Sequence, residues 1–157
     1  MVPVYLITSN LSCMKQMFFL LLSIGFLVTS CTKQNGAPET TLNEMLPTDN
    51  NAGSNAKYSG GFNNGPFGTV TGNARVYLKD GKYILALEGV AISNGPDLHV
   101  YLSKELQPLN FIDLGKLKAT NGTQLYDIPG NPDFAAYTYA LVHCQQYNHL
   151  FGSALLQ

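Results

Sequence analysis

Cys144 and three histidines are the side chains of this sequence whose types suit redox or ligand chemistry. His143 and His149 are close to Cys144 in the chain, and His99 lies far upstream. A thiol becomes reactive, or ligates a haem or a metal, where a neighbouring group stabilises its thiolate. On a regular strand His143 and Cys144 point to opposite faces, so their adjacency does not place them together. We take Cys144 as a candidate redox thiol, and Cys144, His143 and His99 as candidate ligands of a haem or metal.

Cys144 also has an inert interpretation that the residues leave open. Free cysteine is among the most buried residue types, and on a strand Cys144 shares its face with Val142 and Ala140. The chain has three cysteines, of which Cys13 and Cys31 belong to the N-terminal region described below. Cys144 is therefore expected to have no intramolecular disulfide partner. An exported protein seldom keeps such a thiol without a reason, because its compartment favours oxidation.

Other kinds of active site find little support. The sequence has no Cys-x-x-Cys-His haem attachment motif, no structural zinc spacing, no Gly-x-Ser-x-Gly elbow and no Walker-type loop. Asp97, Asp113, Asp127 and Asp133 stand beside turn residues, where capping is the simpler role. With 9 Lys+Arg against 10 Asp+Glu, the chain lacks the cationic excess of a nucleic-acid binder. A redox carrier or a binding module fits better than a turnover enzyme.

The N-terminus is typical of an export signal. Residues 17–28 (MFFLLLSIGFLV) form an uncharged apolar run that follows Lys15. The run matches the roughly 7–15 residues of a secretory core and is shorter than the ~20 that a spanning helix needs. We predict a signal peptide over residues 1–30, with Met14 as the expected true start. An uncleaved anchor and a buried core helix are the alternatives.

The signal ends in Leu27-Val28-Thr29-Ser30-Cys31. This stretch resembles the lipobox of bacterial lipoproteins, whose cysteine is lipidated and becomes the first residue of the mature chain. The resemblance implies that Cys31 is acylated, so the partner at this end is membrane lipid, each buried CH₂ adding about 0.8 kcal/mol. Because Thr32 and not aspartate follows, the resemblance implies a lipid-anchored protein of the bacterial cell envelope, at the outer membrane.

The mature chain is expected to have two parts. Residues 31–64 are rich in Asn, Thr, Gly, Ser and Pro, and predict a flexible tether. Residues 65–157 predict one β domain, because short apolar segments alternate with turn residues and no long helical period occurs. The predicted fold is all-β, an antiparallel sandwich or a barrel-like domain.

The clearest local signal is a hairpin around Asp80-Gly81, the residue pair of a type I′ turn. It places Leu78 opposite Tyr83 and Val76 opposite Leu85. Further strands are predicted at residues 98–103, 111–117, 123–128, 140–144 and 152–156, with one helical turn near 133–137 capped by Asp133.

Four separated motifs in this order resemble the DM-thirteen domain, a family found in Skeletor-type animal proteins and in many bacterial exported proteins. The motifs are Gly95–Ser103 (GPDLHVYLS), Asp113–Lys118 (DLGKLK), Leu141–Cys144 (LVHC) and Phe151–Leu155 (FGSAL). The resemblance runs from about Phe67 to Leu155.

The resemblance implies an extracytoplasmic β-rich domain in which Cys144 is the signature cysteine, proposed to act in electron transfer as a bare thiol or as a ligand of a group such as haem. Family members usually have an aromatic residue, often tryptophan, where this chain has His143. We therefore expect a tethered redox protein with an unidentified redox or protein partner. The alternative is a non-catalytic ligand-binding or adhesion module in which Cys144 is structural.

Overall fold

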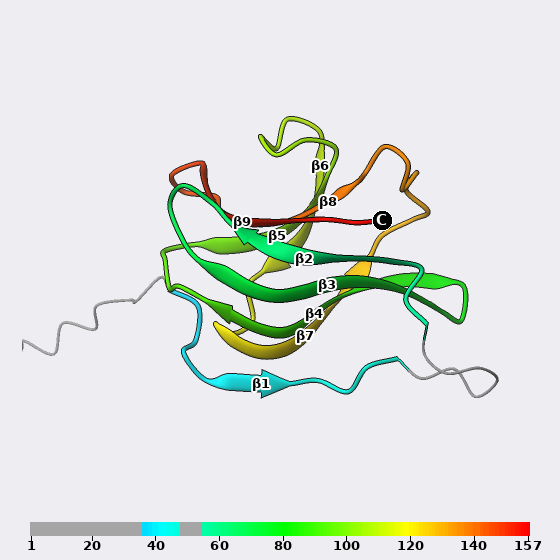
Figure 1. Ribbon diagram of the computed structural model, residues 1–157, viewed down its shortest axis with the longest axis horizontal. Coiled ribbons are helices and arrows are strands. Elements are labelled where there is room, and N and C mark those ends of the chain that lie inside the picture. Colours follow the sequence, from blue (N-terminus) through cyan, green and yellow to red (C-terminus); the bar gives the residue numbers. More distant parts are fainter. Residues whose placement is uncertain (1–35, 48–54) are drawn as a thin grey trace, which may run out of the picture. The chain divides into compact units, whose positions relative to one another are not determined.

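The computed structural model describes residues 36–47 and 55–157 (Figure 1), and this part of the chain contains strands and turns but no helix. The predicted all-β class is confirmed. The strands are β1 (Thr41–Asn43), β2 (Tyr58–Asn64), β3 (Val70–Lys79), β4 (Lys82–Ile92), β5 (Leu98–Ser103), β6 (Phe111–Lys116), β7 (Asn121–Ile128), β8 (Tyr139–Cys144) and β9 (His149–Leu155).

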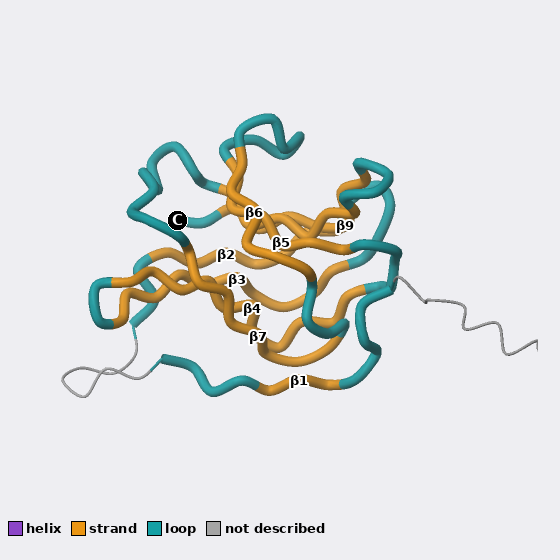
Figure 2. The backbone as a smooth tube through the Cα atoms, turned by 180° about the vertical axis from the view of Figure 1, so that it is seen from behind, coloured by secondary structure: helices purple, strands orange, loops and turns teal. Residues whose placement is uncertain are grey.

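These strands form one sheet in the order β1-β7-β4-β3-β2-β9-β8-β5-β6. Neighbouring strands are antiparallel, except that β1 lies parallel to β7. The sheet curls, so that β7, β4 and β3 face β8 and β5 across the interior, as the two opposite views show (Figures 1 and 2). Of the two expected forms, the barrel-like one is found, as a half-barrel.

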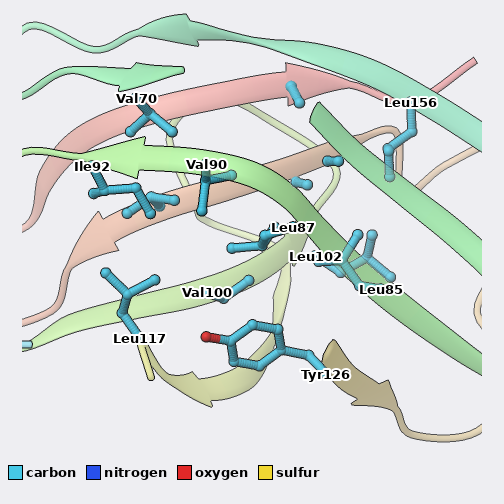
Figure 3. Close-up of a cluster of buried hydrophobic side chains, with 14 of the residues drawn as sticks. Val70, Leu85, Leu87, Val90, Ile92, Val100, Leu102, Leu117, Tyr126 and Leu156 are labelled. Carbon is cyan, nitrogen blue, oxygen red and sulfur yellow. The ribbon is translucent and has the colours of Figure 1, made fainter. Parts of the chain in front are cut away.

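The inner face of the curled sheet holds the hydrophobic core. Leu85 and Leu87 of β4 point toward Val100 and Leu102 of β5, and all four side chains are fully buried (Figure 3). The core positions within β4 and β5 are two residues apart, as the alternation of side chains along a strand requires. The interior of the half-barrel is therefore filled by side chains, and burial of this apolar surface is the main stabilising contribution.

The predicted hairpin is confirmed in detail. Asp80 and Gly81 both have positive φ, at 50° and 75°, as a type I′ turn requires. Leu78 pairs with Tyr83, and the register of β3 and β4 continues from there. A glycine and an aspartate tolerate this left-handed backbone better than most residues, which is why a two-residue signal sufficed to set the register.

The other predicted strands are also present, with ends displaced by at most a few residues. Residues 98–103 match β5 without change, and β9 begins three residues earlier than expected, at His149. Near 133–137 the chain makes a single turn in which the amide of Tyr137 donates to the carbonyl of Asp133 over 2.8 Å. The Asp133 carboxylate accepts a 2.9 Å hydrogen bond from Ala135 N, which is the predicted capping role.

The segment expected to be a tether contains two strands. β1 pairs with β7, and β2 joins the two halves of the sheet by pairing with β3 and β9. A Cβ atom at Gly60 would lie 2.0 Å from the carbonyl oxygen of Leu155, so glycine is needed where β2 crosses its neighbour. Tyr58 and Phe62 pack against the core. The composition of this segment resembles that of a linker, although at Gly60 the glycine serves close backbone packing.

A buried polar cluster closes the connection from β6 to β7. The side chain of Gln124 is fully buried. Its amide nitrogen donates to the carbonyl of Ala119 over 2.6 Å, and its oxygen accepts hydrogen bonds from the amides of Ala119 and Lys118 and from the hydroxyl of Tyr126. Because every polar atom of this amide is paired, its burial costs little, and the link between the two halves of the half-barrel is fixed.

The predicted signal peptide and Cys31 lie outside the described residues. Within the described ranges, no helix is long and apolar enough to span a membrane.

Candidate functional site

Cys144 is the last residue of β8 and points to the inner face of the half-barrel. Its register partners are Leu98 of β5 and His149 of β9. The side chain is 1% exposed and belongs to the hydrophobic core. The thiol lies 3.0 Å from the carbonyl oxygen of Pro96, to which it donates a hydrogen bond. Cys144 is a free cysteine within the described part of the chain, as the sequence predicted.

The residues Asn94–Asp97, which we call the turn, cover the thiol. Besides Pro96, the turn contributes the carbonyl of Asp97, which accepts a 3.0 Å hydrogen bond from the amide of Gln145, directly after Cys144. Asp97 has a φ of 52°, a left-handed conformation that costs a non-glycine residue free energy. The carbonyls of Pro96 and Asp97 therefore hold the turn against the end of β8, and the turn contains one residue with a strained backbone.

His99 and His143 lie on the other face of the same two strands. They are register partners across β5 and β8, directly beside the pair formed by Leu98 and Cys144. Because side chains alternate along a strand, the two histidines point outward where Cys144 points inward. The structure thus brings His99 and His143 together and separates both from Cys144, so one group cannot be ligated by all three candidates.

His99 is held between carboxylates. Its Nδ1 lies 2.9 Å and 3.1 Å from the two oxygens of Asp113 on β6, and its Nε2 lies 3.5 Å from Oδ1 of Asp97. Lys116 Nζ binds the same Asp97 oxygen at 3.0 Å. The hydrogen bond from Lys116, together with its positive charge and that of His99, lowers the pKa of Asp97 below its usual value against a smaller effect of burial. The network ties the turn to β5 and β6.

Tyr101 continues this buried outer face. Its ring centroid lies 5.3 Å from that of His143 and 4.3 Å from that of Phe111. Burial raises the pKa of the Tyr101 hydroxyl, and the charge of Asp113 adds to the effect. Burial also lowers the pKa of His143, which favours its neutral form, and the nearby histidines act in the same direction.

Two ring nitrogens of this outer face have no hydrogen-bond partner within the described residues. They are Nε2 of His99 and Nδ1 of His143, and these two residues are 7% and 3% exposed. A buried polar atom without a partner is unfavourable by about 1–3 kcal/mol, so Nδ1 of His143 marks a position for a bound water or ligand atom. Nε2 of His99 instead faces the Asp97 carboxylate at 3.5 Å. Within the described ranges no three His, Cys, Asp or Glu side chains converge closely enough to hold a metal ion.

The third histidine, His149, lies at the rim of the half-barrel. Its ring is parallel to that of Phe67 with a centroid distance of 3.6 Å, and Tyr147 lies 5.9 Å away. Phe67 and Tyr147 are more than half exposed. These rings form an aromatic surface at the end of the sheet where Cys144 lies.

A haem ligated by Cys144 does not fit this arrangement. The thiol is enclosed by core side chains, its hydrogen bond is made to a backbone carbonyl, and the two histidines lie on the opposite face. An axial ligand needs an open side toward the metal. A bare thiol, which is the other form implied by the resemblance, requires no such opening.

Sequence reasoning assigned Asp97 and Asp113 to capping and did not consider Lys116. Asp113 does cap locally, since its Oδ1 accepts a 2.8 Å hydrogen bond from Gly115 N, but both acids also contact His99. A signal was present for Asp97, because it precedes His99 by two residues and so shares its face in an extended chain. Asp113 and Lys116 depend on the register of β6 against β5, which no local pattern reveals.

Comparisons with known proteins place this arrangement in a family. No curated protein and no solved structure matches the chain. A family model described as Electron transfer DM13 matches residues 62–156, which include seven strands from β3 to β9, the turn, Cys144 and the histidines. The resemblance inferred from the four motifs is confirmed, and the chain belongs to the Electron transfer DM13 family.

Proposed function

We propose that this protein is an exported lipoprotein of the bacterial cell envelope whose domain takes part in electron transfer or thiol redox chemistry through Cys144. The observation that carries the proposal is the free thiol of Cys144, placed at a strand end beneath a single turn within the family match. No other side chain in the described ranges places a thiol beneath this turn.

The local contacts explain how the thiol can be both protected and usable. The carbonyl of Pro96 accepts a hydrogen bond that only the protonated thiol can donate. Core side chains on the other side exclude water from the sulfur. Access therefore requires movement of the turn, which as a connecting segment belongs to the class that opens locally.

The redox role is tested on the full chain with Cys144→Ser, which keeps a hydrogen-bond donor at this position. We expect reaction of the wild-type protein with peroxide to add oxygen to Cys144, detected by mass spectrometry of the peptide that contains it, and no redox signal from the variant in protein-film voltammetry. Cys31→Ser is the matched control and keeps the signal. Equal voltammetric signals in wild type and Cys144→Ser would exclude Cys144 as the redox group.

The tether is a separate part of the proposal. Acylated Cys31 would hold the domain at the outer membrane, and membrane lipid is its partner there. Mass analysis of the mature N-terminus is expected to show cleavage before Cys31 and the mass of attached acyl chains. In Cys31→Ser the protein should move from the membrane to the soluble fraction. An unmodified N-terminus in the wild type would contradict this assignment.

A second candidate function is a non-catalytic ligand-binding or adhesion module. It is favoured by the apolar surroundings of Cys144, since core side chains and a carbonyl, without a thiolate-stabilising cation in the contacts of its sulfur, are what a structural cysteine needs. Under this alternative Cys144→Ser lowers stability by about 1–2 kcal/mol and leaves function otherwise intact. Loss of binding after replacement of Phe67 or Tyr147 would support it.

The two forms of the redox proposal, a bare thiol and a haem ligand, are separated by an absorption spectrum and a metal analysis. Purified full-length protein with and without added haem is examined for haem absorbance, and its metal content is measured. From the enclosed thiol we expect no haem absorbance in either sample. A haem band that disappears in Cys144→Ser would overturn the bare-thiol form of the proposal.

A further inference from the structure

A pocket of about 540 Å³ lies on the outer side of the turn. One wall is formed by residues 36–39, which we call the strap, and the other by Asn94, Gly95 and Pro96. The strap and the turn lie side by side at the same end of the domain in both views (Figures 1 and 2), and Gly36 forms a β-bridge with Pro96.

Pro96 is shared by the pocket and the thiol site. It lines the pocket, and its carbonyl oxygen accepts the hydrogen bond from Cys144 on the inner side. The strap and the turn are joined by a 3.0 Å hydrogen bond from Nδ2 of Asn94 to Oε1 of Glu39. One residue of the turn therefore separates the pocket from the thiol.

The turn is anchored on its far side by charge. Asp97 binds Lys116 at 3.0 Å and lies 3.5 Å from His99, while its backbone holds Gln145. Lys116 has an exposed side chain, so this ion pair is the part of the anchor most easily broken. If it opens, the turn loses its link to β6 and its strained backbone at Asp97 can relax.

We propose that the pocket is the route by which small uncharged molecules reach Cys144, and that the Asn94–Asp97 turn is its movable wall, held closed by Asp97 through Lys116 and His99. This deepens the proposed redox function, on which it rests, by naming the class of reagent that the thiol meets. Glu39 places a carboxylate at the pocket, whereas the Asp97 carboxylate is paired with Lys116. The charge of Glu39 repels anions, and a neutral molecule is not opposed.

The route is tested by alkylation of the full-length protein with iodoacetamide, which is neutral, and iodoacetate, which is an anion. In each reaction the Cys144 sulfur bonds to the reagent carbon, iodide leaves and the thiol proton passes to solvent. Mass spectrometry of the Cys144 peptide gives both rates, each divided by the rate in the urea-unfolded chain. We expect the corrected rate for iodoacetamide to exceed that for iodoacetate by about threefold or more, the factor one nearby charge gives in water.

Glu39→Gln tests the charge. It should raise the iodoacetate rate severalfold and leave the iodoacetamide rate nearly unchanged, because only the anion is repelled. Asp127→Asn makes the same change of charge at an exposed position near the C-terminal end of β7, outside the pocket, and serves as the control. Equal corrected rates for the two reagents in the wild type, or equal shifts in Glu39→Gln and Asp127→Asn, would overturn the charged route.

Lys116→Met tests the movable wall. It should raise the iodoacetamide rate severalfold at unchanged global stability, and Lys116→Arg should restore the slow rate because it keeps the ion pair with Asp97. Lys82→Met, at the exposed tip of the β3–β4 hairpin, is the matched control and should change nothing. The rates are compared with global unfolding in hydrogen exchange.

The outcomes separate this inference from the redox proposal. Labelling that occurs only at the rate of global unfolding overturns the route, whatever Cys144 does. Labelling through the turn together with a voltammetric signal that survives in Cys144→Ser supports the route and overturns the redox assignment.

Discussion

The inner and outer faces of β5 and β8 differ in the polarity of their side chains, although neighbouring residues supply both faces. Along β5 and β8 the inner face contains Val100, Val142 and Cys144, which belong to the hydrophobic core, and the outer face contains His99 and His143. Both faces are buried, but only the outer one has buried ring nitrogens without a partner. Adjacent positions along one strand therefore differ in environment. One side chain packs in the hydrophobic core, and the next belongs to the polar network on the other face. The candidate ligand histidines and the candidate redox thiol therefore lie on opposite faces of the same two strands.

The largest expected effect is on the inner face. Leu102→Ala removes a fully buried side chain from β5, and we expect the free energy of unfolding to fall by about 3 kcal/mol because a cavity remains. Urea unfolding followed by circular dichroism measures it. Leu109→Ala is the control, since Leu109 is 81% exposed and should change stability by less than about 0.5 kcal/mol. A similar small loss for both variants would contradict the assignment of the core.

The next effect is on the outer face. Asp113→Ala removes the hydrogen-bond partner of His99 Nδ1, and stability should fall by about 1.5 kcal/mol, which is typical of a charge-assisted hydrogen bond. Asp127→Ala, at an exposed position, is the comparison and should be nearly neutral. If the two variants lose equal stability, the network around His99 does not stabilise the fold.

Phe111→Ala is expected to have a smaller effect. Phe111 packs on the ring of Tyr101 but is itself partly exposed, so the loss should be about 1 kcal/mol. Near-ultraviolet circular dichroism should show a weaker tyrosine signal, because Tyr101 loses the ring that fixes its position. An unchanged tyrosine signal would mean that Tyr101 is held by the sheet alone.

The smallest effect is a pH dependence. Because burial lowers the pKa of His143 in the folded state, the unfolded chain binds its proton first as the pH falls below about 6.5. The contribution of this group is present above that pH and is lost as the pH falls toward the folded pKa. His143→Phe should therefore show a weaker loss of stability between pH 7.5 and about pH 5.5. Parallel pH profiles in urea unfolding would disprove this contribution of His143.

Much of the fold was accessible from local patterns. The Asp80-Gly81 turn set the register of the hairpin, and the alternation along residues 98–103 and 140–144 predicted that His143 and Cys144 lie on opposite faces. The four motifs predicted the family, which the comparison confirmed over residues 62–156. These features depend on neighbours in the sequence, and steric rules for one strand or turn determine them.

What escaped prediction depends on contacts between distant segments. β2 was taken as part of a tether because its segment is rich in Asn, Thr, Gly, Ser and Pro, whereas the need for glycine at Gly60 comes from its close approach to Leu155. Asp113 was assigned to capping alone, because its contact with His99 arises from the pairing of β5 with β6.

The sequence by itself determined that this chain forms an all-β domain and that His143 faces away from Cys144, because side-chain alternation and turn chemistry act over a few residues. The tertiary structure alone decided that His99 and His143 are partners, that the thiol is covered by Pro96, and that a pocket adjoins that cover. Strand order and sheet curvature follow from packing of the whole core, and no local segment contains that information.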